Sequence, residues 1–225
     1  MRFSFDQEDN TVKRYLTEFI GTFFLVLTIG LTILGGSQFA ALAIGSVLMA
    51  MVYMGGHISG GHYNPAVTLA VAVRGKMKRR DVVPYMGVQV LGALLAGGVV
   101  YVILGDTFAP TPGPEASLGA ALLVEFLFAF ALALVVLNTA TVNETEGNSY
   151  FGLAIGFTLA VGVFAGGSVS GGAFNPAVSI GPVIVDTLNG ADSYTVVWIY
   201  VISQFAGGAL AALVSSIQHD AYLST

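Results

Sequence analysis

The sequence contains no cysteine and few charged residues. Only 9% of its 225 residues are Asp, Glu, Lys or Arg, whereas soluble domains carry roughly 25%. Without cysteine the chain has no disulfide, no thiolate metal site and no cysteine nucleophile. The three histidines, His57, His62 and His219, are scattered and do not form a metal site. We therefore expect no metal and no cofactor, and we expect no nucleic-acid partner.

The residues that are present predict an integral membrane protein. Hydrophobic residues make up 55% of the chain, and the mean hydropathy is +0.81. The glycines in Gly152-x-x-x-Gly156 and Gly162-x-x-x-Gly166 have the spacing of close helix contacts in lipid. Six apolar runs are long enough to span a bilayer. They cover about residues 15–34, 39–55, 83–104, 118–137, 151–165 and 195–217, after a polar tail at residues 1–14.

Positive charge is missing from most of the chain. All eight Lys and Arg lie in the first 80 residues, in the N-terminal tail and in a loop at residues 74–80. An even number of spans places both termini on one side, and the positive-inside rule makes that side cytoplasmic. The opposite loops carry Asp106, Glu115 and Asp192 but neither Lys nor Arg. We expect a multi-pass protein of the plasma (inner) membrane with cytoplasmic termini.

A ten-residue stretch occurs twice. Residues 59–68 read SGGHYNPAVT, and residues 170–179 read SGGAFNPAVS. Asn is a good helix N-cap, and Pro suits the first helical position because its missing N–H would be unpaired there. Each copy thus predicts a loop that opens a short helix at Asn64 or Asn175, over about residues 65–73 and 176–187. Two short interrupted segments at matching places indicate a site at the membrane midplane.

The repeat extends over both halves of the chain. Glu18 in the first span matches Glu125 in the fourth, and Gln89 in the third matches Gln204 in the sixth. Each half, about residues 11–104 and 118–217, holds three spans and one short helix. Because three is odd, the halves take opposite orientations, and the short helices meet at their N-termini. Residues 1–225 are thus expected to form a single all-α channel domain.

Two acids lie within full spans. Glu18 and Glu125 are costly in a bilayer, and an intramembrane carboxylate is a functional hypothesis by default. The alternative is structural, since a buried carboxylate can accept hydrogen bonds from the backbone N–H groups of a glycine-rich loop. The repeat favours this structural role, because each loop then has one supporting acid. Gln89 and Gln204 have the same interpretation.

The two asparagines offer amide groups at the meeting point of two helix N-termini. The summed helix dipoles make this point electropositive, so a cation is disfavoured there and a neutral molecule with a lone pair is accepted. His62 lies two residues before Asn64, where the second copy has Ala173. Two roles remain open for His62, in the wall of a pore or as a partner for loop carbonyls.

These motifs resemble those of the aquaporin and glycerol-facilitator family, the major intrinsic proteins. The resemblance covers the whole chain: six spans, two Asn-Pro-Ala boxes, and the Glu of the first and fourth spans. It implies a right-handed bundle, a homotetramer in the lipid bilayer with one pore per subunit, and water or small neutral solutes as permeants. It also implies that loop backbone lines the pore, at Gly60, Gly61, His62, Gly171, Gly172 and Ala173.

The chain departs from the family pattern at one position. Most members have Arg directly after the second Asn-Pro-Ala box, and here that residue is Val178. By the family pattern, the other positions of the outer filter are Ile44, Val163 and Gly172. All four are apolar or glycine, so the barrier to cations at the filter is weakened. Either the filter is wide and passes larger neutral solutes, or its apolar side chains form a constriction that excludes water.

Three classes of function were compared. The first is a passive channel for water or small neutral solutes such as glycerol, urea, ammonia or hydrogen peroxide. The second is an ion- or proton-coupled secondary transporter, which would need Glu18 or Glu125 as a titrating group in the path. The third, a membrane enzyme, has no support, because the sequence shows no catalytic set and no phosphate-binding loop. The repeat and the two boxes favour the passive channel.

Overall fold

The computed structural model describes residues 11–219 and contains six helices that are long and apolar enough to cross a membrane. The predicted all-α membrane fold is therefore confirmed. α1 begins at Thr11, so the predicted tail at residues 1–14 is shorter than expected. Residues 1–10 and 220–225, which include the rest of both predicted tails, lie outside the described part. The long helices are α1 (Thr11–Leu34), α2 (Ala40–Ser59), α4 (Arg79–Leu104), α5 (Leu118–Ala140), α6 (Phe151–Ser170) and α8 (Val197–Gln218).

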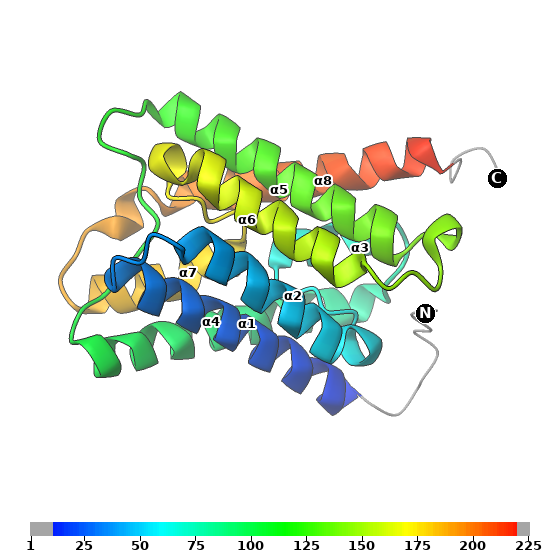
Figure 1. Ribbon diagram of the computed structural model, residues 1–225, viewed down its shortest axis with the longest axis horizontal. Coiled ribbons are helices and arrows are strands. Elements are labelled where there is room, and N and C mark those ends of the chain that lie inside the picture. Colours follow the sequence, from blue (N-terminus) through cyan, green and yellow to red (C-terminus); the bar gives the residue numbers. More distant parts are fainter. Residues whose placement is uncertain (1–10, 220–225) are drawn as a thin grey trace.

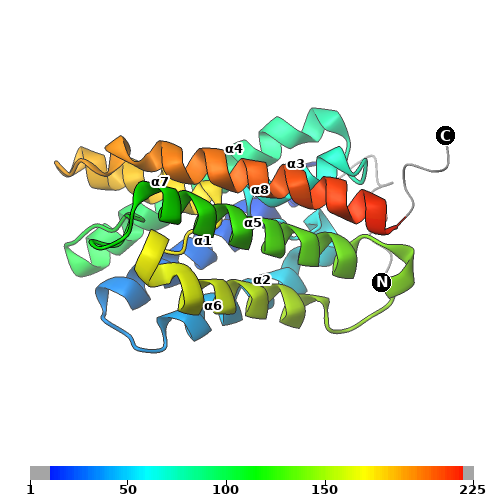
Figure 2. The same cartoon turned by 90° about the horizontal axis from the view of Figure 1, so that it is seen from above.

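Two short helices lie among the long ones, as the sequence predicted. They are α3 (Pro65–Val73) and α7 (Pro176–Leu188), and two single turns of 3₁₀ helix, η1 (Asn143–Thr145) and η2 (Ser193–Thr195), lie in connecting loops. α3 and α7 lie toward opposite ends of the bundle (Figures 1 and 2). The start of α1, the loop before α4 and the end of α8 share one end (Figure 1), which we call the basic end because it carries residues 74–80.

Helices α2 and α6 continue further than the sequence predicted. They were expected to end near residues 55 and 165, but they end at Ser59 and Ser170. The Gly-Gly pairs at residues 55–56 and 166–167, next to the predicted ends, remain helical. The helices end instead at Gly60 and Gly171, whose φ angles of 95° and 85° are the left-handed C-cap conformation that glycine adopts at low cost.

The packing of the helices follows the predicted repeat. In the first half α1 packs on α2 and α4, and in the second half α5 packs on α6 and α8 in the same way. The halves also interlock, because α3 packs on α8 and α7 packs on α4. Each short helix is thus held by the last long helix of the opposite half, and α2 and α6 close the bundle by packing on each other.

The contact between α2 and α6 depends on two glycines. A Cβ atom on Gly156 would overlap the carbonyl oxygen of Gly45, and a Cβ atom on Gly45 would overlap that of Gly156. The helix backbones therefore touch without side chains between them, as small residues allow in membrane helix pairs. Gly162 and Gly166, which were also predicted to allow a close helix contact, instead make room for the ring of Phe174.

We expect Gly156→Ala to destabilise the protein by about 1–3 kcal/mol, because the added methyl group forces α2 and α6 apart. The matched control is Gly98→Ala on α4, where a Cβ atom would have no neighbour within 4 Å. Thermal unfolding in detergent would measure both variants. Equal unfolding temperatures for Gly156→Ala and the parent protein would show that the helix contact is not tight.

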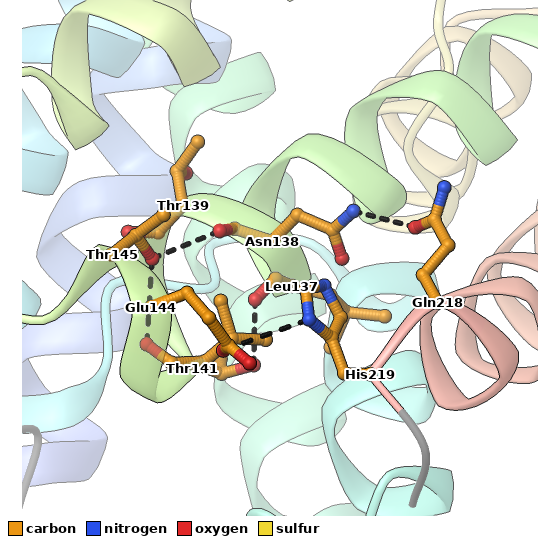
Figure 3. A network of polar contacts seen from close by, with 9 residues as sticks. Leu137, Asn138, Thr139, Thr141, Glu144, Thr145, Gln218 and His219 are labelled. Carbon is orange, nitrogen blue, oxygen red and sulfur yellow. Dashed lines mark hydrogen bonds and ion pairs between the residues drawn. The ribbon is translucent and has the colours of Figure 1, made fainter.

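The end of α8 is fastened to the loop between α5 and α6 at the basic end (Figure 3). The Asn138 amide donates to Gln218 Oε1 at 2.7 Å, and His219 Nδ1 lies 3.6 Å from a Glu144 oxygen. The Thr145 hydroxyl donates to the Asn138 carbonyl at 2.9 Å and so holds the loop to the end of α5. These contacts fix the last described residues of the chain against the first helix of the second half.

Candidate functional site

Asn64 and Asn175 cap the two short helices, as the sequence predicted. The Asn64 side-chain oxygen accepts from the backbone N–H of Ala66 at 2.8 Å, and that of Asn175 accepts from Ala177 at 2.9 Å. Both asparagines have extended backbone, and Pro65 and Pro176 occupy the first helical positions. Because the caps use only the side-chain oxygens, the amide NH₂ groups remain available for other partners.

The two caps are joined to each other's loops. The Asn64 amide donates to the carbonyl of Phe174 at 3.0 Å, and the Asn175 amide donates to the carbonyl of Tyr63 at 2.8 Å. The N-termini of α3 and α7 therefore meet, although the asparagines are 111 residues apart (175 − 64). Each NH₂ group has two hydrogens, and one is used in the cross-link. The second N–H of each amide is free to bind a molecule beside it.

The residues that accept these bonds have an unusual backbone. Tyr63 and Phe174 have φ angles of 48° and 49°, and they are the only non-glycine residues with positive φ in the described chain. Such backbone is strained for bulky residues and persists only where the surroundings hold it. The rings provide that hold, since Tyr63 lies against Gly21 and Gly55. This pair was not predicted from the sequence, although an aromatic residue precedes Asn in both boxes.

Glu18 supports the first loop from behind. Its Oε1 accepts from the Ser59 hydroxyl at 2.6 Å and from the backbone N–H of His62 at 2.9 Å. Its Oε2 accepts from the backbone N–H of Tyr63 at 2.7 Å and from the Gln89 amide at 2.9 Å. The carboxylate is fully buried and accepts four hydrogen bonds, which is its full capacity.

Glu125 supports the second loop in the same way. It accepts from the Ser170 hydroxyl at 2.7 Å, and from the backbone N–H groups of Ala173 at 3.0 Å and Phe174 at 2.7 Å. The Gln204 amide completes the set at 2.7 Å. The buried acids thus have the contacts that a structural role requires, and that role itself remains a prediction.

The glutamines link each acid to a short helix. The Gln89 amide donates to Glu18 and also to the Thr68 hydroxyl at 2.9 Å. The Gln204 amide does the same between Glu125 and the Ser179 hydroxyl, also at 2.9 Å. A longer pattern was overlooked in the sequence, because a tyrosine stands four residues before each glutamine. Tyr85 and Tyr200 donate to the carbonyls of Ser59 and Ser170 at 2.8 and 2.6 Å.

His62 breaks the symmetry of the two loops. Its Nδ1 lies 3.1 Å from the Thr68 hydroxyl, and the side chain is buried. Ala173 occupies the matching place in the second loop and offers no polar side chain. His62 also lines the cavity described next, and the polar partner of its ring is the Thr68 hydroxyl.

One cavity of about 490 Å³ joins most of the predicted site residues. It contains Asn64 and Asn175, the four filter residues Ile44, Val163, Gly172 and Val178, and the loop residues His62, Gly171 and Ala173. Gly60 and Gly61, predicted to line the path, are not among its lining residues, and neither are Glu18 and Glu125. The loop at residues 108–111 lines the cavity near the filter and was not predicted from the sequence.

Among residues 11–219, no Asp, Glu, Lys or Arg side chain lines the cavity. Its polar groups are the asparagine amides, His62, Tyr63, Gln38, Thr111, Ser168 and loop backbone. The N-termini of α3 and α7 add partial positive charge at the asparagines. Within residues 11–219 no three His, Asp or Glu side chains cluster as metal ligands would. This arrangement can bind and orient a small neutral polar molecule.

Comparisons with known proteins agree with this geometry. The chain is 37% identical over 211 residues to aquaporin NIP1-1 of Zea mays, covering 89% of this chain and 73% of that protein. It is 35% identical to glycerol uptake facilitator protein-like 6 of Lactiplantibacillus plantarum, covering 92% and 98%. The structure of the aquaglyceroporin from Plasmodium falciparum superposes with a TM-score of 0.80 at 21% identity, covering 90% and 94%.

The motifs, the paired caps and the relatives indicate one family, and the family model for the major intrinsic proteins matches residues 5–215. The chain is a member of the major intrinsic protein family.

Proposed function

We propose that this protein is a passive channel for water and small neutral solutes, with glycerol-sized molecules among its permeants. The observation that carries the proposal is the cavity, which passes all four apolar filter residues and reaches both asparagines. A filter closed by its own side chains would divide this space in two. The geometry therefore favours the wide filter over the dry constriction. The name of the relative from Lactiplantibacillus plantarum, a glycerol uptake facilitator, agrees with this choice.

The filter selects by size and by the cost of removing water from the permeant. Ile44, Val163 and Val178 offer no hydrogen bond, so a permeant can present its CH groups to them at little cost. The backbone of residues 171–173 lies on the cavity wall and supplies carbonyl groups for hydroxyl or amide hydrogens. Beyond the filter, the free N–H groups of Asn64 and Asn175 replace part of the lost hydration.

Coupling to ions or protons is not supported by the site. A coupled transporter needs a titrating carboxylate that the permeant or ion can reach. Glu18 and Glu125 accept four hydrogen bonds each and do not line the cavity. The acids thus lie behind the loops that line the path, where they can hold the loops but cannot exchange ions with the permeant.

Stopped-flow light scattering on proteoliposomes tests the proposal. After an impermeant osmotic shock we expect shrinkage well above the rate of empty liposomes, and after a glycerol shock we expect fast re-swelling. Neither rate should change when a proton or sodium gradient is imposed. Water flux at the empty-liposome rate with folded protein would indicate a dry filter, and gradient-dependent flux would indicate a coupled transporter.

The orientation and assembly follow from the same proposal. The protein would lie in the plasma (inner) membrane with its basic end facing the cytoplasm. This orientation follows from the positive-inside rule, because Lys13, Arg14 and residues 74–80 all lie at the basic end. Residues 1–225 would form one channel domain, made of the two interlocked halves. By family analogy four copies would associate, each with its own pore.

A further inference from the structure

The basic end has positive charge that no described carboxylate neutralises. Arg14 pairs with Asp81 at 2.8 Å, and the other ion pair within residues 11–219 joins His219 to Glu144. The five cations of residues 74–80 therefore have no carboxylate within 4.0 Å. Three of them, Lys78, Arg79 and Arg80, are exposed at the start of α4.

The segment that carries these cations is held in place. The Arg74 guanidinium donates to the Ser216 hydroxyl of α8 at 3.3 Å, and the Met77 side chain is buried. The N–H of Lys76 donates to the carbonyl of Val71, and the N–H of Asp81 donates to that of Lys78, both at 3.0 Å. The cations thus project from a loop with a defined backbone.

An exposed apolar stripe runs down α4 from these cations. Val83 is 76% exposed, and it lies one turn after Arg79 on the same helix face. Leu91 and Leu95 continue this face at 56% and 50% exposure. At Gly87, between Val83 and Leu91, a Cβ atom would have no neighbour within 4 Å, so the stripe has a notch there. The stripe consists of Val83, Gly87, Leu91, Leu95 and Val102.

We propose that this face of α4, with Arg79 and Arg80 at its head, is a binding site for an anionic phospholipid. An acyl chain that lies along Val83 and into the notch at Gly87 places the headgroup phosphate level with Arg79 and Arg80. Guanidinium groups bind phosphate oxygens through paired N–H donors, which suits this contact better than a single ammonium group. Juxtamembrane cation clusters of this size attract anionic lipid.

Charge argues for a lipid rather than a second copy of the chain on this face. Two copies meeting along α4 would bring Arg79 and Arg80 of each close together, and the adjacent Asp81 is buried and already paired with Arg14. An anionic lipid instead supplies negative charge beside these exposed cations.

Native mass spectrometry tests the proposal with the purified full-length protein. The probes are phosphatidylglycerol and phosphatidylcholine with identical acyl chains, supplied in equal amounts in detergent. We expect a preference for phosphatidylglycerol of roughly tenfold, and we expect the double substitution Arg79→Gln with Arg80→Gln to remove most of it. The matched control, Lys13→Gln with Lys76→Gln, removes the same charge from residues outside α4 and should retain the preference.

Four outcomes would overturn the proposal. An unchanged preference in the Arg79→Gln, Arg80→Gln protein would exclude these cations, and an equal loss in the control would indicate a diffuse field rather than a site. Displacement of the lipid by excess inorganic phosphate would mean that the cations bind free anions. Since the chain has no cysteine, Val83→Cys tests for a second copy, and disulfide-linked dimers on oxidation would show that protein covers this face. Thermal unfolding confirms that each variant is folded.

Discussion

Replacing Glu18 with alanine should destabilise the protein by about 2–6 kcal/mol, the largest effect on stability expected for a single side chain in this structure. The substitution leaves the backbone N–H groups of His62 and Tyr63 buried without an acceptor, and each such loss costs about 1–3 kcal/mol. The hydroxyl of Ser59 and the amide of Gln89 lose the same partner. No water is at hand to replace the carboxylate in a bilayer.

The loss should be visible in the folded yield and in the thermal unfolding of the purified protein. Glu125→Ala should lower the folded yield and the unfolding temperature to a similar extent, because the second carboxylate accepts from an equivalent set of donors. Glu144→Ala is the matched control, since that side chain is 67% exposed in the loop between α5 and α6. If Glu18→Ala unfolds at the same temperature as Glu144→Ala, the loops do not depend on the acid.

The local pattern around each box was sufficient to predict most of the fold. Asn-Pro specifies a cap and a first helical residue, so both short helices begin where the sequence indicated, at Pro65 and Pro176. The match of Glu18 with Glu125 indicated the repeat, because the two acids precede their Asn-Pro-Ala boxes by similar distances in the sequence and should therefore occupy equivalent places in the two halves. The predicted ends of α2 and α6 were wrong because a helix end depends on packing and cap geometry, which a single sequence does not show.

The contacts between distant segments could not be predicted in this way. The bond from Asn64 to the Phe174 carbonyl requires the left-handed backbone of Phe174, and that conformation depends on a ring seated against Gly162 and Gly166. The loop at residues 108–111 belongs to a connection with no periodicity, so nothing in the sequence placed it in the cavity wall. The width of the filter also depends on backbone positions, which a single sequence does not show.

A second large effect is expected at the filter. Val178→Arg should lower glycerol permeability by roughly tenfold or more, equivalent to about 1.4 kcal/mol in the barrier, while water permeability falls much less. Val178 is buried and lies on the cavity wall with Ile44 and Val163. A longer side chain there reduces the cross-section, and its guanidinium holds water by hydrogen bonds that a larger solute must displace.

Two measurements on the same proteoliposomes distinguish a selective loss of glycerol permeability from a general loss of flux. Stopped-flow shrinkage reports water, and re-swelling in glycerol reports the solute, so their ratio cancels differences in the amount of protein inserted. Val178→Leu is the control for size, since it adds one carbon and leaves the wall apolar. We expect Val178→Leu to reduce glycerol flux less than Val178→Arg does, because it cannot bind water in the filter.

The ratio of the two permeabilities also tests the placement of the filter itself. If Val178→Arg leaves glycerol flux unchanged in folded protein, Val178 does not lie at the narrowest point, and selection occurs elsewhere along the cavity. The region of the asparagines would then be the next candidate, since loops from both halves approach the path there. If water and glycerol fall together, the arginine has closed the pore, and the filter is narrower than a cavity of about 490 Å³ suggests. A selective loss of glycerol is the result that a wide apolar filter requires, because only there does an added side chain have room to restrict large permeants and still pass small ones.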